Sequence, residues 1–130
     1  MAFTVLVVDD NRMMRGMVSR AVGMSGLSIG KLLEAADGAQ ALAVMRSEWT
    51  DLVLLDINMP VMDGEEFLSQ VRADPALHAT MVIVVSTESS QPRIARLKSM
   101  GAGFIHKPFR PEQLVEAVND LMAGKTGGAT

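Results

Sequence analysis

The chain has 130 residues, of which 48% are hydrophobic and 21% charged, and its formal net charge is −3. This length predicts one domain, and the composition excludes a wholly disordered chain. The acidic balance argues against a protein built mainly to bind nucleic acid or an anionic membrane. Cysteine is absent, which excludes a disulfide framework and a thiolate metal site. No signal-peptide pattern and no apolar run of about 20 residues occur, so we expect a cytoplasmic chain without membrane insertion.

Five short apolar segments are predicted to be strands. Most are rich in Val, Ile or Leu and do not alternate with polar residues, which is typical of strands buried on both faces of a parallel sheet. In chain order these segments are Phe3–Val8, Ile29–Ala35, Leu52–Leu55, Met81–Val85 and Gly103–His106.

Each predicted strand is followed by a segment with helical periodicity. Apolar residues recur three and four positions apart, which predicts a helix with one face packed on the sheet. Pro111 is placed where the last helix would begin, and Pro92 lies in the first turn of the helix before it. The apolar positions are Met14, Met17, Val18, Ala21 and Val22; Ala39, Leu42 and Ala43; Phe67, Leu68 and Val71; Ile94, Leu97 and Gly101; and Leu114, Val115, Val118, Leu121 and Met122.

A strand–helix unit repeated five times predicts an α/β fold. Right-handed crossovers place helices on both faces of a doubly wound, five-stranded parallel sheet. We expect one domain over residues 1–123 and a flexible, Gly-rich C-terminal tail over residues 124–130. In such folds, ligands bind beyond the carboxyl ends of the strands.

Acidic residues follow two of the predicted strands. The first strand is followed by Asp9 and Asp10, and the third by Asp56. The carboxyl ends of parallel strands meet at one sheet edge, so these carboxylates should converge, where they repel one another. A hard divalent cation relieves the repulsion, and carboxylate, carbonyl and water oxygens make a natural Mg²⁺ site.

Two further polar residues should reach the same edge. Ser86 ends the fourth strand and supplies a hydroxyl donor, and Lys107 follows the fifth and supplies a positive charge. A carboxylate can accept a phosphoryl group as an acyl phosphate, and Asp56 is the predicted nucleophile. Charge on the transferring oxygens would be dispersed by the metal and by Lys107.

Four separate segments resemble the receiver domain of two-component response regulators. The similarity covers residues 3–122, and without an output domain the chain is similar to the stand-alone CheY class. It implies a flavodoxin-like sheet in the order 2-1-3-4-5. The matching segments are Val5–Asp10 (VLVVDD), Leu55–Gly64 (LDINMPVMDG), Val84–Ser86 (VVS) and Phe104–Phe109 (FIHKPF).

The resemblance also implies roles for the site residues. Asp56 would be phosphorylated from a histidine kinase or a histidine phosphotransfer protein. Asp9, Asp10 and Asp56, together with the backbone carbonyl of Asn58, would hold Mg²⁺. Lys107 would pair with the phosphoryl group and precede a cis peptide bond.

Signalling would follow from a change of shape. The family's switch positions are filled by Ser86 and Phe104, and a downstream partner would bind the face formed by the fourth helix, fifth strand and fifth helix. Such a chain catalyses its own phosphotransfer and dephosphorylation but is a signalling protein, not an enzyme with a separate substrate. Chemotaxis is one expected pathway, and a phosphorelay carrier or phosphate sink is the alternative.

Several residues depart from the usual family pattern or invite other interpretations. Thr87 stands where Ala or Gly is usual and should narrow access to the pocket, while Phe104 lacks a phenol hydroxyl. Arg110 replaces a residue with a capping side chain before the last helix. We expect Trp49 to pack under a loop, and His106 to lie at a solvent-exposed strand edge.

Two rival functions use related chemistry. Aspartate-based phosphohydrolases also combine paired acids, Mg²⁺ and a lysine, but their acids lie two residues apart and a cap covers the substrate. Flavin binding on the same fold needs a hydroxyl- and glycine-rich loop after the first strand. The acidic residues Asp9 and Asp10 at that position would repel a phosphate.

Overall fold

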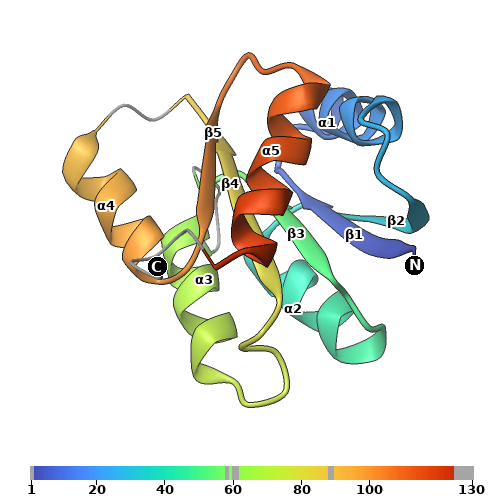
Figure 1. Cartoon of the computed structure of the whole chain (residues 1–130). Coiled ribbons are helices and arrows are strands. Elements are labelled where there is room, and N and C mark those ends of the chain that lie inside the picture. Colours follow the sequence, from blue (N-terminus) through green and yellow to red (C-terminus); the bar gives the residue numbers. More distant parts are fainter. Residues whose placement is uncertain (1, 58, 60–61, 88–89, 125–130) are drawn as a thin grey trace.

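The computed structural model describes residues 2–57, 59, 62–87 and 90–124, and within them strands and helices alternate along the chain (Figure 1). All five expected strands form, and the only boundary that differs is that of the fourth strand, which continues to Ser86. The elements are β1 (Phe3–Val8), α1 (Arg12–Met24), β2 (Ile29–Ala35), α2 (Gly38–Ser47), β3 (Leu52–Leu55), α3 (Gly64–Ala73), β4 (Met81–Ser86), α4 (Gln91–Ser99), β5 (Gly103–His106) and α5 (Pro111–Met122).

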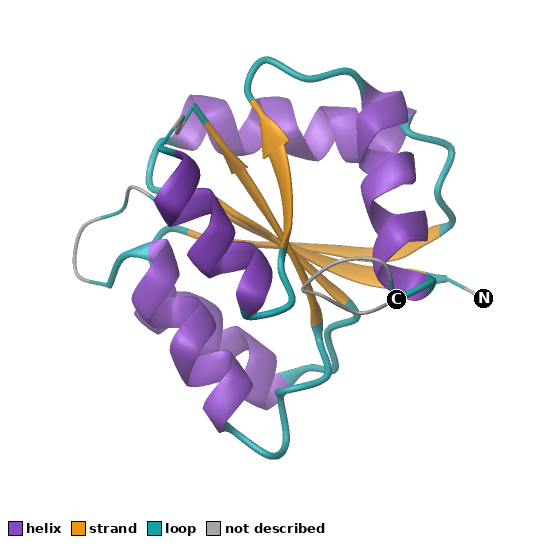
Figure 2. Ribbon diagram, turned by 60° about the vertical axis from the view of Figure 1, so that its left-hand side comes forward, coloured by secondary structure: helices purple, strands orange, loops and turns teal. Residues whose placement is uncertain are grey.

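The five strands form one parallel sheet in the order β2-β1-β3-β4-β5, as predicted. Helices cover both of its faces (Figure 2). Phe67 and Leu97, from α3 and α4, belong to a buried cluster on one face that also includes residues of α2. Val18 and Leu114, from α1 and α5, belong to the cluster on the other face. The central strand β3 is buried along its whole length, which explains why it reads as a continuous apolar run.

The helix starts follow from local hydrogen bonding. Asn11, Asp37 and Asp63 each accept a hydrogen bond from the backbone N–H three residues later, at 2.8 to 3.0 Å, and so cap α1, α2 and α3. At α5 the side chain of Arg110 makes no cap. Instead, the Arg110 backbone N–H donates to Gln113 Oε1 at 2.8 Å, so half of a capping box remains.

Three side chains expected in the interior are exposed. Met17 and Met122 are 49% and 64% exposed, because Val18, Val22, Leu114 and Val118 fill the buried stripes of α1 and α5. Trp49 is 76% exposed and does not pack under a loop. Its indole N–H donates to Asp51 Oδ1 at 2.8 Å, so its polar group has a partner without burial.

Arg72 of α3 joins two loops on the side of the sheet that α3 covers. Its Nε donates to the carbonyl of Met100 at 2.7 Å, and its Nη1 donates to the carbonyls of His78 at 2.9 Å and Thr80 at 2.7 Å. Burial lowers the pKa of the Arg72 guanidinium, which still stays protonated at physiological pH. The side chain thus ties the end of α4 to the segment that leads into β4.

No helix within the described part of the chain combines the length and the apolar character needed to cross a membrane. A cytoplasmic location and a domain boundary at residue 123 stay predictions. Residues 125–130 of the expected tail lie outside the described residues.

The first residue of α3 has no space for a side chain. A Cβ at Gly64 would lie 2.5 Å from Ile57 Cα, whereas a Cβ at Gly16 in α1 would meet nothing within 4 Å. We predict that Gly64→Ala lowers the free energy of unfolding by about 1–3 kcal/mol through overpacking. Gly16→Ala should raise it by about 0.5–1 kcal/mol, because glycine is unfavourable inside a helix.

Urea unfolding of both variants measures this pair of effects. Equal effects of the two substitutions would contradict the close approach between α3 and the segment that follows β3.

Candidate functional site

The sheet register brings the polar residues to one edge. Val8 of β1 pairs with Leu55 of β3, so Asp9 and Asp56 both follow the last paired residue of their strands. Leu55 in turn pairs with Val84, and β4 continues for two residues to Ser86. The neighbour of Ser86 on β5 is His106, which directly precedes Lys107. The predicted convergence at the carboxyl edge therefore occurs.

Three carboxylates form a compact cluster at this edge. One carboxylate oxygen from each of Asp9, Asp10 and Asp56 lies within 4.8 Å of the others. Asp9 is buried, Asp56 is half-buried and Asp10 is exposed. The donors are hard oxygens from charged groups, a set that fits Mg²⁺. The backbone carbonyl expected to complete this set belongs to Asn58, which lies outside the described residues.

The Asp9 carboxylate has partners on both oxygens. Its Oδ1 accepts the Asn11 backbone N–H at 2.9 Å, and its Oδ2 pairs with Lys107 Nζ at 3.2 Å. Both side chains are largely shielded, with 13% of Lys107 and 4% of Asp9 exposed. Because solvent screens charges less at shielded positions, the Coulombic attraction between these two groups is stronger than it would be at the surface. The ammonium of Lys107 therefore offsets part of the negative charge of the cluster.

The backbone around Lys107 is also fixed. Its N–H donates to the Ser86 carbonyl at 3.0 Å, which continues the β4–β5 ladder past the end of β5. The peptide bond between Lys107 and Pro108 is cis, as the resemblance implied.

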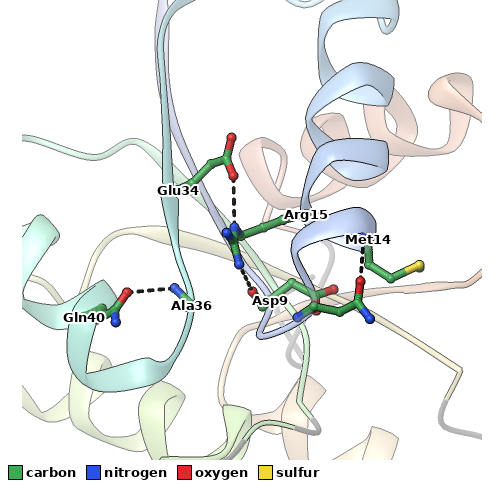
Figure 3. A network of polar contacts seen from close by, with 7 residues as sticks. Asp9, Met14, Arg15, Glu34, Ala36 and Gln40 are labelled. Carbon is green, nitrogen blue, oxygen red and sulfur yellow. Dashed lines mark hydrogen bonds and ion pairs between the residues drawn. The ribbon is translucent and has the colours of Figure 1, made fainter.

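Arg15 of α1 holds the backbone of Asp9 in place through hydrogen bonding, a role that was not predicted from the sequence. Its Nη1 donates to the Asp9 backbone carbonyl at 2.9 Å, and its Nε pairs with Glu34 Oε1 at 2.9 Å (Figure 3). Glu34 belongs to β2, so the guanidinium links helix, edge strand and acidic loop. The sequence offered one signal for this role, a charged residue on the side of α1 that faces the sheet. Its partner Glu34 lies 19 residues away and could not be identified from local patterns.

The two expected switch residues lie on neighbouring strands, Ser86 at the end of β4 and Phe104 inside β5. Ser86 is buried, with 1% of its surface exposed, and Phe104 is half-buried against the core on the α2–α4 face. The Phe104 ring meets the exposed His106 edge to face, with centroids 4.9 Å apart. Phe104 pairs with Val84 and His106 with Ser86, so both aromatic residues are sheet neighbours of the segment that ends at Ser86.

Comparison with known sequences assigns the family. The family model of the response regulator receiver domain matches residues 5–119. The chain therefore belongs to the response regulator receiver domain family.

Particular relatives point to more than one kind of regulator. The chain is 32% identical over 122 residues to the nitrate/nitrite response regulator protein NarL of Escherichia coli, covering 94% of this chain and 56% of that protein. It is 34% identical over 128 residues to the probable transcriptional regulatory protein TcrX of Mycobacterium tuberculosis, covering 98% and 52%. The chain thus spans about half the length of these curated relatives.

A solved structure matches over nearly its full length. The chemotaxis protein CheY4 of Vibrio cholerae superposes with a TM-score of 0.80 at 35% identity, covering 93% of this chain and 99% of that one. Receiver domains are signalling proteins that act with histidine kinases and downstream targets, and they generally bind Mg²⁺ at an acidic pocket.

The acid cluster predicts that Asp10→Asn has opposite effects on the free energy of unfolding in the absence and in the presence of Mg²⁺. In EDTA, Asp10→Asn should leave the free energy of unfolding unchanged or raise it by up to about 1 kcal/mol, because it removes carboxylate repulsion at an exposed position. Mg²⁺ at a hundred times its Kd should stabilise the wild type by about 2.7 kcal/mol and the variant by clearly less.

Urea unfolding with EDTA or Mg²⁺ measures both effects. Asp120→Asn, which removes an exposed carboxylate on α5, serves as the control and should respond to Mg²⁺ like the wild type. The same Mg²⁺ response in Asp10→Asn would show that Asp10 does not bind the ion.

Proposed function

We propose that this chain accepts a phosphoryl group on Asp56 from a histidine kinase or a histidine phosphotransfer protein. One observation carries the proposal: three carboxylates lie together at the carboxyl edge, with Lys107 Nζ 3.2 Å from Asp9 Oδ2. Asp56 is the central acid in this proposal, because β3 presents it between the ends of β1 and β4.

The transfer exchanges one bond for another. An Asp56 carboxylate oxygen attacks phosphorus, and the bond between phosphorus and the donor imidazole nitrogen breaks. The electron pair of that bond stays on the imidazole ring, whose second nitrogen carries a proton in the reactive donor, so the ring leaves as neutral imidazole. Lys107 Nζ lies 3.2 Å from Asp9, which belongs to the same carboxylate cluster as Asp56, so Lys107 is the proposed cation for the incoming phosphoryl oxygens. The Ser86 hydroxyl is the proposed hydrogen-bond donor on the β4 side.

The metal fits the same arrangement. Asp9, Asp10 and Asp56 would hold Mg²⁺, with the Asn58 carbonyl as a further proposed ligand. When bound, Mg²⁺ supplies positive charge that stabilises the phosphoryl oxygens. Asp9 is held in place for this role by the Asn11 N–H and by Arg15.

The phosphoryl group leaves by hydrolysis. Water attacks phosphorus, the bond to the Asp56 oxygen breaks, and the carboxylate is regenerated together with inorganic phosphate. The chain promotes both its own phosphorylation and this reversal, and we propose that it has no separate substrate to turn over. Its product is a signalling state.

Signalling is proposed to run through β4 and β5. A phosphoryl group on Asp56 would draw the Ser86 hydroxyl and the following loop toward it, and Phe104 would repack inward. Because Phe104 lacks a hydroxyl, packing alone would hold its new position. A partner that prefers this arrangement of the α4–β5–α5 face would shift the population toward it.

The similarity to chemotaxis protein CheY4 supports chemotaxis as the first pathway to examine. The similarity to NarL and TcrX supports a different output for the same phosphorylation chemistry. A phosphorelay carrier or phosphate sink is the alternative within the family. Rapid transfer to a histidine phosphotransfer protein, without phosphorylation-dependent binding elsewhere, would favour that alternative.

Phosphorylation by acetyl phosphate with Mg²⁺ tests the central step. The wild type should gain the mass of one phosphoryl group, and Asp56→Asn should gain none, because an amide cannot form the acyl phosphate. Intact-mass spectrometry measures the gain. Asp37→Asn is the matched control, since Asp37 caps α2 and asparagine caps equally well. Equal labelling of wild type and Asp56→Asn would reject the proposal.

The switch predicts a separate effect of Ser86→Ala. This substitution removes the proposed hydrogen bond from the Ser86 hydroxyl to the charged phosphoryl group. Losing such a bond costs about 1.5–3 kcal/mol, which lowers the ratio of active to inactive conformers about tenfold or more. Beryllofluoride with Mg²⁺ should therefore change the backbone amide shifts of Phe104 much less in this variant.

NMR spectra with and without beryllofluoride measure these shifts. Ser47→Ala, at the exposed end of α2, should respond like the wild type. Full shifts at Phe104 in Ser86→Ala would show that the serine does not transmit the change.

A further inference from the structure

An apolar groove of about 330 Å³ lies beside the acidic site. The helix α1 forms one wall with Met14, Met17, Val18 and Ala21, and Pro108 and Phe109, which follow β5, form the other. This volume is at the lower end of the roughly 300–1,000 Å³ typical of small-molecule pockets. It therefore suits a short chain or a small ring.

The polar residues of the groove include Lys107, which also lines the void at the proposed phosphoacceptor. Among the described lining residues of the groove Lys107 alone is charged, and Thr87 adds a hydroxyl. Lys107 and Val18 also line a small void that Asp9 and Asp56 share. Lys107 and Val18 thus line both the groove and the acidic site, and the Lys107 ammonium lies 3.2 Å from Asp9 Oδ2 in that site.

We propose that this groove is a subsite for the acyl group of small-molecule acyl phosphates, an inference that rests on the function proposed above. Such a donor is apolar at one end and anionic at the other. The apolar walls match the acyl chain, and Lys107 matches the phosphoryl group. The described residues that line the groove include a cation and no carboxylate, which favours this ligand over a purely apolar or a cationic one.

The step balances without another reactant. An Asp56 oxygen forms a bond to phosphorus, and the bond between phosphorus and the acyl oxygen breaks. The leaving carboxylate keeps the electron pair, so no proton transfer is required. Burial of the acyl chain contributes to the binding free energy of the donor. This contribution is smallest for acetyl phosphate, whose acyl group has a single methyl group.

The subsite predicts a preference for longer acyl chains. A fully buried methylene contributes about a fourfold gain in affinity, so butyryl phosphate should phosphorylate the wild type about five to fifteen times faster than acetyl phosphate at low donor concentration. Second-order rate constants with both donors and Mg²⁺ are measured by intact mass, with the site of labelling mapped to Asp56.

Two variants probe the walls of the groove. Met17→Gln makes one wall polar and Ala21→Phe fills the space, so each should bring the butyryl-to-acetyl ratio close to one. Met24→Gln is the matched control, because Met24 is a 74% exposed methionine of the same helix outside the groove. It should keep the wild-type ratio. The midpoint of thermal unfolding verifies that each variant is folded, and Met17→Gln carries the test if Ala21→Phe does not fold.

The outcomes separate this inference from the proposed function. Equal wild-type rates with the two donors, or an unchanged ratio in Met17→Gln, would overturn the acyl subsite. Labelling of Asp56 by acetyl phosphate would then still support the proposed function. No labelling of Asp56 by either donor would overturn both.

Discussion

The site depends on the repulsion among the carboxylates of Asp9, Asp10 and Asp56, which the fold holds together although their charges oppose it. The fully buried strand β3 and its neighbours fix the backbone positions, and the Lys107 ammonium offsets part of the charge through its pair with Asp9. In the proposed function, a divalent cation would complete this neutralisation and a phosphoryl group would compete with Asp9 for Lys107. The same carboxylate repulsion would then account for the proposed metal binding, the proposed phosphoryl transfer and the start of the proposed conformational change.

Most of the fold could be predicted because its signals are local. The strands of a parallel sheet are buried on both faces and read as apolar runs, and the helices between them show one apolar stripe. The predictions for Met17 and Met122 were wrong because residue type indicates a preference for burial but not the width of the buried stripe of a helix. On α1 the residues Val18 and Val22 already fill the contact with the sheet. The prediction for Trp49 was wrong for another reason, because this loop residue has a partner for its indole N–H in Asp51 without burial.

The candidate site could be predicted in part for a different reason. Parallel strands bring their carboxyl ends to one edge, so residues directly after β1, β3 and β5 converge whatever their separation in sequence. The supporting contacts of Arg15 with Glu34, and of Arg72 with three carbonyl groups, follow no such rule. They depend on the orientation of long side chains across elements, which only the three-dimensional structure supplies.

The position of Lys107 is the most direct readout of this account. A crystal structure with Mg²⁺ and beryllofluoride, which mimics a phosphoryl group, should show the fluoride complex bound to an Asp56 oxygen. Lys107 Nζ should then contact a fluorine instead of keeping its 3.2 Å pair with Asp9 as its main contact. An empty site, with Lys107 still paired to Asp9 or turned toward solvent, would contradict the claim that the carboxylate cluster and Lys107 together receive a phosphoryl group.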